Sequence, residues 1–497
     1  MHVMITGGSG VIGAGLIPEL LARGHQVRLL ARGADLAARE WPEGVTAFAA
    51  DVTEAEQLKG AADGCDAVVH VTGIVAETLP DLTFERVNVA GTANVLSEAS
   101  RAGRPAFVYI SSLGAERGAS EYHKSKRRAE ELVSKYGGHW IILRPGNVYG
   151  PGDEVISKLL SMHRTLPIIP MIGSGTDEFQ PIWYTDLGKA ITAAIDSRVD
   201  KGTYDLAGEE LTNTKDLLDR FELITSRAPL RLPVPEFLAS LTTRVAEATG
   251  TPFPINESQL QMIVEHNVIE PTEKNALTRI FRVEATPLAE GLRLLADAQP
   301  EQQPGEGVGG LERKRFYASI TGSQFSPEQL LEQFRRRFAE LVPINFDAEP
   351  GAPAEVAKGA TLTAALPLRG NIQIRVEEVT PLSLTLATLR GHPLAGVVRF
   401  STNGQGSGPI QFEVTVFARA ATVFDWIALN SGGSIAQNRT WRSVVERAIE
   451  ISGGSSGPVE EEKDTLSDDE EKRVEEWIRD LIATQKLETR NESTGSE

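Results

Sequence analysis

A short apolar strand that runs into a glycine cluster at the start of the chain constrains the fold more than any other feature. The first thirteen residues read MHVMITGGSGVIG, with apolar residues from Val3 to Ile5 and a helical pattern after the glycines. Gly7 permits a tight turn, Gly10 leaves no side chain in the way of a phosphate, and Gly13 lets the helix pack on the strand. This order of strand, glycine turn and helix N-terminus is typical of a site where backbone N–H groups bind a pyrophosphate.

The same turn defines a first group of candidate binding residues. Its spacing fits both T-G-x-x-G-x-x-G and G-x-G-x-x-G, and it follows the first strand of the chain directly. Free N–H groups at a helix N-terminus are natural partners for phosphate oxygens. We therefore expect contacts to a dinucleotide from Thr6, Gly7, Gly8, Ser9, Gly10, Val11, Ile12 and Gly13.

Bulk composition narrows the classes of function. The 497 residues are too many for one core, so two or three domains are expected. A net charge of −18 argues against nucleic acid as a main partner, because a phosphate-binding face needs clustered Lys and Arg. Cys65 is the single cysteine, which excludes an intrachain disulfide. The eight histidines show no paired ligand spacing, so no metal site is predicted.

The expected location of the protein is the cytoplasm. No apolar run reaches the length of a transmembrane helix, and no secretion signal precedes the first strand. A single cysteine also suits a reducing compartment.

The first 150 residues alternate strand-like and helix-like segments. Strand-like runs occur at His2–Thr6, Gln26–Ala31, Val45–Ala50, Asp66–Val71, Ala106–Ser111 and His139–Arg144. Helix-like segments separate them at Gly10–Ala22, Ala55–Ala61, Phe84–Ala102 and Glu121–Tyr136. The alternation predicts an α/β fold with a Rossmann-type, doubly wound parallel sheet. A less regular region that follows is expected to form a smaller substrate lobe, which gives a first domain of residues 1–298.

A second domain is expected after a linker. Residues 299–312 are rich in Pro, Gly and Gln, with no apolar period, which is typical of a linker. Residues 313–451 are predicted to form an α+β domain of the helix-on-sheet kind. Its first helix has an N-cap at Ser326, a strand meander follows, and a helical segment at Trp426–Ile451 closes the domain.

The last segment, residues 452–497, is predicted to be a flexible acidic tail. From Glu460 onward it contains 14 acidic and 6 basic residues, a net charge of −8. Ser467 and Glu470 form a capping box that starts one amphipathic helix. This helix could dock on its own protein or on a protein partner through an apolar stripe of Val474, Trp477, Ile478, Leu481 and Ile482.

Candidate catalytic residues follow the fifth strand. Tyr122 and Lys126 lie four residues apart at the start of a helix and therefore on one face. A nearby ammonium lowers the pKa of a phenol by stabilising the phenolate, so we expect Lys126 to lower the pKa of Tyr122. Ser111 and Ser112 end the strand, where a hydroxyl can polarise a substrate carbonyl. Ser112, Tyr122 and Lys126 are thus the predicted set for hydride transfer beside a nicotinamide. His123 faces another side of the helix and is expected to be solvated.

An ordered series of motifs runs through the first domain: Thr6–Gly13, Asp51-Val52, His70–Gly73, Asn88–Asn94, Ser111–Ala115, Tyr122 with Lys126, Leu143–Gly152 and Trp183–Asp186. The series resembles the short-chain dehydrogenase/reductase superfamily, in its extended and atypical branch of NAD-dependent epimerase/dehydratase proteins. The Ser-Ser-Leu-Gly-Ala phrase is similar to the group that contains the Rossmann-type accessory subunit of respiratory complex I. Fewer residues separate Ser112 from Tyr122 than in sugar-nucleotide epimerases, which disfavours a sugar-nucleotide substrate.

The resemblance implies further contacts to the cofactor. Asp51 and Val52 would hold the adenine, Gly73 would line the cofactor, and Arg144–Val148 would flank the nicotinamide and the substrate. The full set implied in this way is Asp51, Val52, Val71, Thr72, Gly73, Asn88, Ser111, Tyr122, Lys126, Arg144, Pro145, Gly146, Asn147 and Val148.

The choice of cofactor can be argued from charge. An NAD site places a carboxylate on the ribose 2′-OH at the end of the second strand, about 20 residues past the last glycine. That position reads Leu-Leu-Ala-Arg, and Arg32 suits a 2′-phosphate instead. NADP is therefore the predicted cofactor, with NAD as the alternative.

The second domain shows a weaker resemblance. Leu389–Phe400 and Phe412–Arg419 resemble an uncharacterised bacterial domain that is sometimes fused to such dehydrogenases. That domain is similar in pattern to helix-grip lipid-binding folds. Its inward apolar side chains are expected to form a core.

Two functions remain open at the level of sequence. One is an NAD(P)-dependent oxidoreductase or epimerase/dehydratase that acts on a small molecule. The other is a non-catalytic nucleotide-binding scaffold or assembly protein that uses its C-terminal domain for a partner or an apolar ligand. A homodimer is compatible with both. The substrate itself cannot be derived, because a fold does not specify it.

Overall fold

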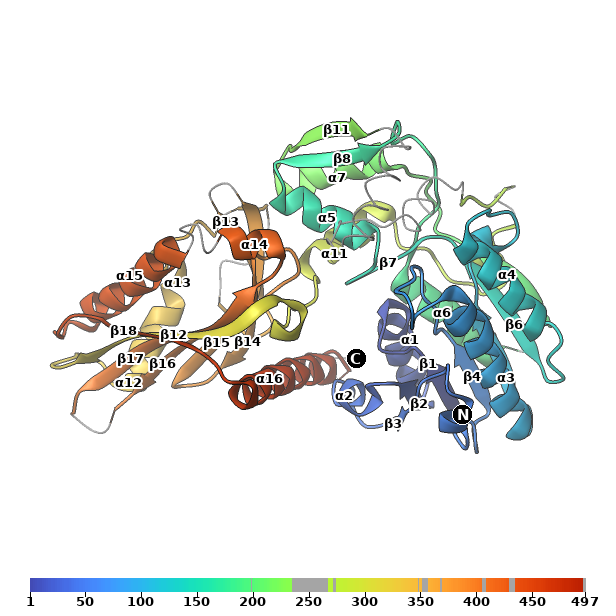
Figure 1. Ribbon diagram of the computed structural model, residues 1–497, viewed down its shortest axis with the longest axis horizontal. Helices are drawn as coiled ribbons and strands as arrows, with labels where there is room; N and C mark the ends of the chain where they lie inside the picture. Colours follow the sequence, from blue (N-terminus) through green and yellow to red (C-terminus); the bar gives the residue numbers. More distant parts are fainter. Residues whose placement is uncertain are drawn as a thin grey trace.

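The computed structural model describes residues 1–197, 199–234, 267–270, 274–346, 348–350, 356–366, 369–404, 408–428 and 434–494. Two sheet-containing parts stand side by side, the first in blue to green and the second in yellow to red (Figure 1). Among the described residues, no helix combines the length and the apolar character needed to cross a lipid bilayer.

A parallel sheet of seven strands forms the first part, which confirms the predicted Rossmann-type α/β fold. Its order is β10-β6-β5-β4-β1-β2-β3. The strands are β1 (His2–Thr6), β2 (Gln26–Ala31), β3 (Val45–Ala49), β4 (Ala67–His70), β5 (Ala106–Ile110), β6 (Trp140–Pro145) and β10 (Gly202–Leu206). The chain leaves the central pair β4 and β1 in opposite directions, so a crevice opens at the carboxyl ends of these strands.

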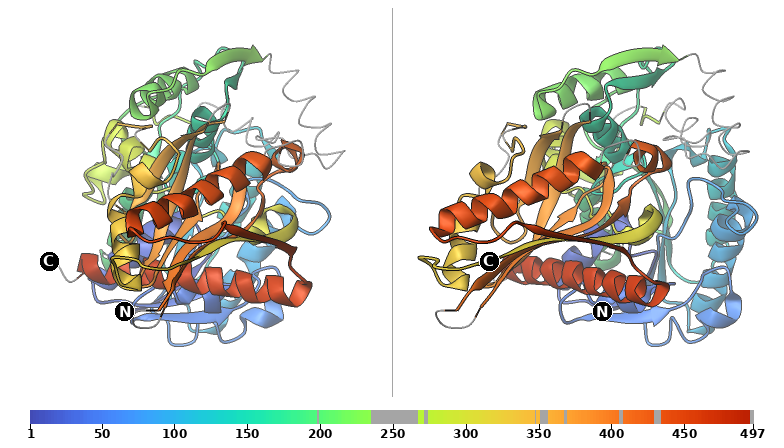
Figure 2. Two further views of the ribbon diagram at one scale, coloured as in Figure 1. Left: turned by 90° about the vertical axis from the view of Figure 1, so that its left-hand side faces the viewer. Right: turned by 60° about the vertical axis from the view of Figure 1, so that its left-hand side comes forward.

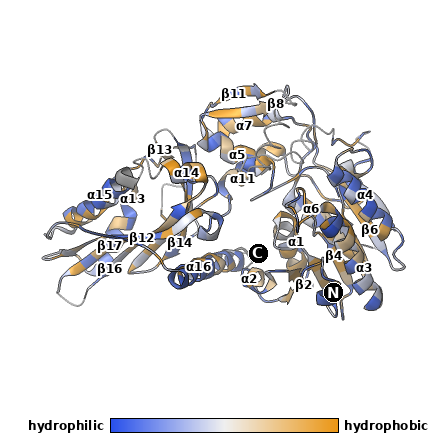
Figure 3. Ribbon diagram, in the orientation of Figure 1, coloured by the Kyte–Doolittle hydropathy of each residue, from blue (hydrophilic) through white to orange (hydrophobic). Residues whose placement is uncertain are grey.

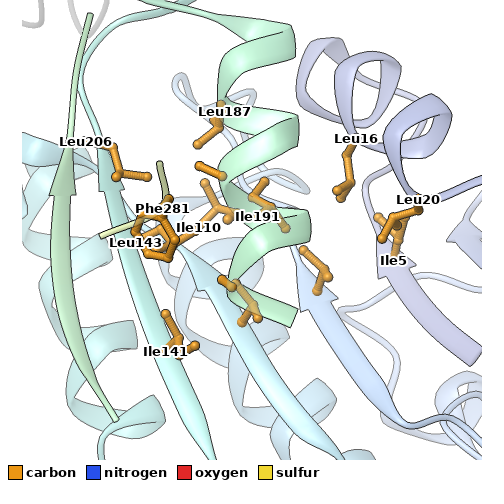
Figure 4. Packing of buried hydrophobic residues seen from close by; sticks show 14 of the residues in the cluster. Ile5, Leu16, Leu20, Ile110, Ile141, Leu143, Leu187, Ile191, Leu206 and Phe281 are labelled. Carbon is orange, nitrogen blue, oxygen red and sulfur yellow. The ribbon is translucent and has the colours of Figure 1, made fainter. Parts of the chain in front are cut away.

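Helices cover both faces of this sheet. One face carries α1 (Val11–Ala22) and α6 (Tyr184–Asp196), and the other carries α3 (Gly91–Arg101) and α4 (Glu121–Val133). The core under α1 and α6 contains Ile5, Leu16 and Ile191, all fully buried, and its packing is drawn in Figure 4. Because both faces are covered, these strands are almost continuously apolar.

A smaller lobe extends from the first sheet, as the irregular pattern up to residue 298 predicts. It has its own hydrophobic cluster, which includes Leu160, Phe179 and Phe221. Its elements are β7 (Val148–Tyr149), α5 (Ile156–Thr165), β8 (Ile168–Ile172), β9 (Ile182–Trp183), α7 (Thr214–Thr225), β11 (Leu230–Val234), α10 (Ala276–Arg279) and α11 (Leu288–Asp297).

The second part is an antiparallel sheet of seven strands in the order β13-β14-β15-β16-β17-β12-β18. The strands are β12 (Val308–Ile320), β13 (Thr361–Leu366), β14 (Gly370–Val379), β15 (Ser383–Thr388), β16 (Leu394–Asn403), β17 (Ile410–Ala420) and β18 (Glu460–Thr465). The helices are α12 (Pro327–Arg336), α13 (Phe338–Leu341), α14 (Val423–Ala428), α15 (Ser434–Ser452) and α16 (Asp468–Thr494). The predicted N-cap holds, since Ser326 forms a capping box with Gln329.

Helices lie on both faces of the second sheet as well. α12 and α15 pack on one face over a cluster that contains Phe334, Phe400 and Phe412. α16 packs on the opposite face through Ile478 and Ile482. Figure 2 shows α15 and α16 on different sides of this sheet. The sequence left open whether the apolar stripe of this helix docks on its own protein or on a partner. In the structure Val474, Trp477, Ile478 and Ile482 contact this protein's own sheet.

The structure differs from the predicted linker and flexible tail. In the linker 299–312, Gln299 and Glu301 are buried, and β12 already begins at Val308. The charged side chain of Glu301 can be buried there because it forms ion pairs with Arg375 and Lys486.

The tail 452–497 is likewise part of the fold. Ser455 pairs with Thr321, and β18 adds an edge strand to β12. The sequence analysis did not predict either β12 or β18 as a strand. The exact domain limits remain a prediction. The two sheets and their hydrophobic cores show two parts but do not fix the residues at which each part begins and ends.

Among the described residues, α5 and α16 both take part in contacts between the two parts. Arg164 of α5 forms a bidentate pair with Glu349, at 2.9 and 2.8 Å, and both side chains are buried. On the other side α16 reaches the segment after α2 (Ala34–Ala38), where Arg490 lies 3.5 Å from the ring centroid of Trp41. Lys486 of α16 also pairs with Glu40 at 3.3 Å. Figure 1 shows α16 running toward α2.

Candidate functional site

A cavity of about 660 Å³ opens at the carboxyl ends of the central strands of the first sheet. Sixteen of the predicted residues line it: Gly7, Ser9, Gly10, Val11, Ile12, Val71, Thr72, Gly73, Ser111, Ser112, Tyr122, Lys126, Pro145, Gly146, Asn147 and Val148. Residues from separate stretches of sequence therefore meet at one place. That place is the crevice where ligands bind in open α/β sheets.

The glycine turn is shaped as a pyrophosphate site requires. Gly7 has φ +71°, and a Cβ there would lie 2.9 Å from the Thr72 backbone nitrogen. A side chain at Gly13 would collide with the Gly8 carbonyl, so the start of α1 packs directly on the turn. Gly10 is the N-cap of α1 and brings no capping side chain, and Val11 and Ile12 face the cavity. The residues present fit the phosphates of a dinucleotide.

Thr6, Gly8 and Gly13 lie behind the turn rather than on the cavity wall. The Thr6 hydroxyl lies 2.7 Å from Nδ1 of His70, which is buried between β1 and β5. Burial lowers the pKa of His70 to about 3, with a smaller effect of Lys126 in the same direction. His70 is therefore neutral, and these residues support the turn.

The predicted catalytic residues come together at the start of α4. Ser120 caps this helix by accepting a hydrogen bond from the His123 N–H at 3.3 Å. Tyr122 and Lys126 then project from one face, and Ser112 at the end of β5 lies within hydrogen-bond reach of the phenol. The geometry joins a hydroxyl, a phenol and an ammonium beside the glycine turn.

The electrostatics of this group differ from the expectation. Burial raises the pKa of Tyr122 to about 12, although the hydrogen bond with Ser112 acts in the opposite direction. Lys126 does not lower it: its ammonium donates to the Ile110 carbonyl at 2.7 Å and lies 4.7 Å from the centroid of the Tyr109 ring. Burial lowers the pKa of Lys126 to about 8, and Glu130 opposes this effect. Desolvation has the largest effect on both groups because Tyr122 and Lys126 are buried.

The expectation for His123 was wrong. Its side chain is 0% exposed, with Nε2 at 3.2 Å from the Ser112 Oγ and Nδ1 at 3.0 Å from the Ser120 Oγ. The helical wheel correctly separates His123 from Tyr122. It does not reveal that the loop before α4 folds over the other face.

Arg144 is not on the cavity wall. It forms a bidentate pair with Glu130, at 2.9 and 2.7 Å, and Glu130 also accepts a hydrogen bond from Ser111. The hydrogen bond with Glu130 raises the pKa of Arg144, so its guanidinium stays charged. This network anchors β6 to α4. Because the Ser111 hydroxyl donates to Glu130, it does not act as the hydroxyl that polarises a substrate carbonyl.

Asn88 also acts behind the wall. Its amide oxygen accepts from the Ile74 N–H at 2.8 Å, and its amide nitrogen donates to the Ile74 carbonyl at 3.1 Å and to Ser125 at 2.9 Å. Asn88 thus holds the loop that carries Thr72 and Gly73 against α4.

The residues expected at the adenosine end lie outside the described cavity. Arg32 is exposed directly after β2. Asp51 accepts hydrogen bonds from the backbone and the hydroxyl of Thr53, and Val52 is buried against Gly91. They stand at the ends of neighbouring strands β2 and β3, on the side of the glycine turn away from Tyr122.

The other residues that line the cavity were not predicted from the sequence. They are Ile74, Val75, Ala76, Ile110, Gly152, Asp153, Glu154, Val155, Ile156, Lys158 and Asn267. One signal was available, because Asp153 caps α5 by accepting from the Ile156 and Ser157 N–H groups at 2.7 and 2.9 Å. Burial raises the pKa of Asp153 to about 6 despite these bonds.

Comparison with protein families agrees with this division of the chain. Residues 3–207 match the NAD dependent epimerase/dehydratase family, and residues 328–447 match a family described as Domain of unknown function (DUF1990). The first part of the chain is an NAD-dependent epimerase/dehydratase domain of the short-chain dehydrogenase/reductase type, and the second part carries a DUF1990 domain. This confirms the resemblance drawn from the motifs.

Individual relatives match parts of the chain. Ceramide reductase of Caulobacter vibrioides is 34% identical over 34% of this chain and 53% of its own length. NADH dehydrogenase (ubiquinone) 1 alpha subcomplex subunit 9 of Arabidopsis thaliana is 25% identical over 53% of this chain and 68% of its own. The chain spans only 22% of an uncharacterized protein of Mycobacterium tuberculosis that is 28% identical to it. UDP-glucose 4-epimerase of Thermus thermophilus, solved with NAD, is 25% identical over 60% of this chain and 98% of its own, with a TM-score of 0.47.

Proposed function

We propose that this protein is an NADP-dependent oxidoreductase or epimerase/dehydratase of the short-chain dehydrogenase type, with Tyr122 as its acid/base. The observation that carries the proposal is that Ser112, Tyr122 and Lys126 line the same cavity as the glycine turn. Hydride transfer at a bound nicotinamide needs both a phosphate-binding backbone and a group that exchanges a proton with the substrate.

The three side chains divide the work in the cavity. A bound dinucleotide would supply or accept the hydride. Tyr122 keeps its proton at neutral pH, since burial raises its pKa to about 12, and gives it to the substrate oxygen in the direction of reduction. Lys126, fixed by its bond to the Ile110 carbonyl, brings a positive charge to the cavity wall, where it would help to hold the bound dinucleotide. Ser112 donates a hydrogen bond to the substrate oxygen and orients the substrate.

The preference for NADP rests on Arg32. This exposed guanidinium directly follows β2, where an NAD site has a carboxylate. A guanidinium can form two hydrogen bonds with a 2′-phosphate.

The lining of the cavity favours a substrate with an apolar body. The aliphatic residues Ile74, Val75 and Val155 line the cavity together with Tyr122. A ketone or secondary alcohol on a hydrophobic skeleton would meet these groups while its oxygen reaches the phenol. We also infer a cytoplasmic location, because the single cysteine, Cys65, suits a reducing compartment.

Oxidation of NADPH with a panel of apolar ketones tests the proposal. Tyr122→Phe should leave nucleotide affinity within a few-fold and reduce turnover by ~10²–10⁴, the usual contribution of a positioned acid/base. Tyr204→Phe is the matched control, because the Tyr204 hydroxyl bonds the Asp200 carbonyl on the far edge of the sheet. Full activity of Tyr122→Phe on any substrate found would refute the assignment of this tyrosine.

The scaffold hypothesis is favoured by one observation, the docking of the second part on both lobes of the first through Arg164 and α16. A nucleotide that serves only to stabilise such a scaffold needs no proton donor. In that case Lys126→Ala would weaken nucleotide binding while Tyr122→Phe would change nothing measurable. The two variants therefore separate the two functions.

A further inference from the structure

His123 links the active-site serine to the start of α4. Its imidazole is fully buried, next in sequence to Tyr122 and with ring centroids 5.0 Å apart. Nε2 lies 3.2 Å from the Ser112 Oγ, and Nδ1 lies 3.0 Å from the Ser120 Oγ. Both ring nitrogens thus have a hydroxyl partner, and Ser112 in turn reaches Tyr122 and the cavity.

The loop between Ser112 and Tyr122 is built around this ring. A side chain at Gly114 would collide with Cε1 and Nε2 of the imidazole, and one at Gly118 would collide with Nδ1. The short turn at Leu113–Ala115 closes over the ring, and the Gly118 N–H bonds the Gly114 carbonyl at 2.7 Å. The imidazole therefore has one position, so its hydrogen bonds act on Ser112 in a fixed direction.

A neutral imidazole has one donor and one acceptor nitrogen, so these two bonds have two possible directions. The Ser120 Oγ accepts the His123 backbone N–H as the N-cap, and its own hydroxyl can donate to Nδ1 at 3.0 Å. In that arrangement Nε2 carries the ring proton and donates to the Ser112 Oγ. A Ser112 oxygen that accepts from Nε2 has its proton available for the cavity.

We propose that His123 is a positioning residue that holds the Ser112 hydroxyl as a hydrogen-bond donor toward the substrate oxygen. The opposite tautomer would take the Ser112 proton and leave only lone pairs facing the phenol of Tyr122. The inference rests on the proposed function, since an oriented donor at Ser112 matters only if a substrate oxygen binds there.

The tautomer can be measured without a substrate. In the full chain with ¹⁵N-labelled histidine, the His123 signals are identified as those missing from His123→Gln. The expected result is a ring with a proton on Nε2. A proton on Nδ1 alone would overturn the proposal, whether or not a substrate is ever found.

Kinetics test the consequence with a matched pair of variants. The Gln side chain carries an N–H₂ donor near the position of Nε2, whereas Leu has a similar size and no donor. His123→Leu should lower kcat by ~10²-fold, the order expected for a lost donor at an oxyanion, and change the KM for the dinucleotide by no more than a few-fold. His123→Gln should retain most of the activity. Equal rates in both variants, either normal or equally reduced, would contradict the proposal.

The variant Tyr122→Phe distinguishes a failure of the proposed function from a failure of the role of His123. Tyr122→Phe tests the proposed function, and it does not touch the contact between His123 and Ser112. If Tyr122→Phe is inactive while His123→Leu and His123→Gln are both fully active, only the role of His123 fails. If Tyr122→Phe is fully active, the proposed function fails, and the tautomer still decides whether the Ser112 hydroxyl is oriented as described. Should His123→Leu not fold, the tautomer measurement on the wild type decides the question alone.

Discussion

The two parts of the molecule contain hollows of the same volume and of opposite character. The cavity of the first part and a hollow on the outer face of the second sheet each measure about 660 Å³. In the first, Ser112, Tyr122 and Lys126 converge at strand ends beside a helix N-terminus. In the second, the lining charges neutralise each other, as Arg315 does with Glu413 at 2.8 Å and Glu462 at 2.6 Å. A hollow of this volume is not by itself a binding site. A binding site also needs polar groups that can form hydrogen bonds with a ligand.

The opposite face of the second sheet is filled. Phe334 of α12 lies 5.1 Å from Phe400 and 5.2 Å from Phe412 between ring centroids, and all three are fully buried. The expectation of a core rather than a ligand cavity on this face agrees with that packing. α14 differs, since Phe424 is 66% exposed and Trp426 and Ile427 are about half exposed. This helix is coloured as hydrophobic in Figure 3.

The interface between the two parts gives the largest expected effect. Arg164→Leu leaves the Glu349 carboxylate buried without its bidentate partner, so we expect a loss of ~3–5 kcal/mol of unfolding free energy. Denaturant unfolding measures it. Arg336→Leu is the control, since Arg336 is 68% exposed and its pair with Glu332 is worth ~1 kcal/mol or less.

The same variant tests how independent the two hollows are. If the first part alone makes the site, Arg164→Leu leaves the affinity for nucleotide unchanged. A large loss of affinity would show instead that the second part holds the cavity in shape.

A buried carboxyl in the second part predicts a pH dependence of stability. Glu377 occupies an irregular position of β14, and burial raises its pKa to about 8 from an ordinary value of 4.5. Because the folded state binds this proton more tightly, its contribution is complete below about pH 4.5 and is lost as the pH rises through 8. Glu377→Gln should therefore stabilise the protein by ~1–3 kcal/mol above pH 8 and have little effect at pH 5. Unfolding curves at the two pH values decide, and equal shifts at both would contradict the prediction.

The first part predicts a pH dependence of rate instead. Burial lowers the pKa of Lys126 to about 8, so its positive charge is lost as the pH rises through that value. The kcat/KM for reduction should fall above pH 8 by about tenfold per pH unit, because one protonated group is required. Lys126→Arg keeps its charge at every accessible pH and should remove the fall, even at a lower overall rate. An unchanged decline in Lys126→Arg would assign it to another group.

The smallest effect concerns the choice between NADPH and NADH. Arg32→Ala should weaken NADPH by ~3–10-fold and leave NADH unchanged, since an exposed charge pair is worth about 1 kcal/mol and is screened by salt. Titration of both nucleotides at two salt concentrations measures it. Arg39→Ala is the control, because Arg39 is equally basic and pairs with Asp480 of α16. Equal affinities of the wild type for NADPH and NADH would contradict the prediction that Arg32 selects NADP.

Local signals in the sequence were sufficient for much of the fold. The apolar runs located β1 and β2 at their observed residues, because a buried parallel strand is a compact apolar segment between turn residues. The helix start at Ser326 followed from its cap chemistry. Tyr122 and Lys126 meet at the cavity because four residues make about one helical turn.

Contacts between distant segments were beyond such signals. The motif series predicts Arg144 beside the cofactor, and only the approach of α4 to β6 gives it Glu130 as a partner. Residues Gly152–Ile156 line the same cavity as the glycine turn, although about 140 residues of chain separate the two segments. No local pattern specifies such an approach, since it depends on packing between elements far apart in the chain.

The sequence by itself determined the class of the first part, its glycine turn and its set of Ser112, Tyr122 and Lys126. The tertiary structure alone decided that the acidic run at Glu460–Thr465 is a strand. By composition this run is a solvated charge cluster, with low strand propensity. It pairs with β12 because that edge offers arginines in register, Arg313 opposite Asp464 and Arg315 opposite Glu462. Charges that repel each other along one segment become favourable cross-strand pairs only when the partner strand is beside them.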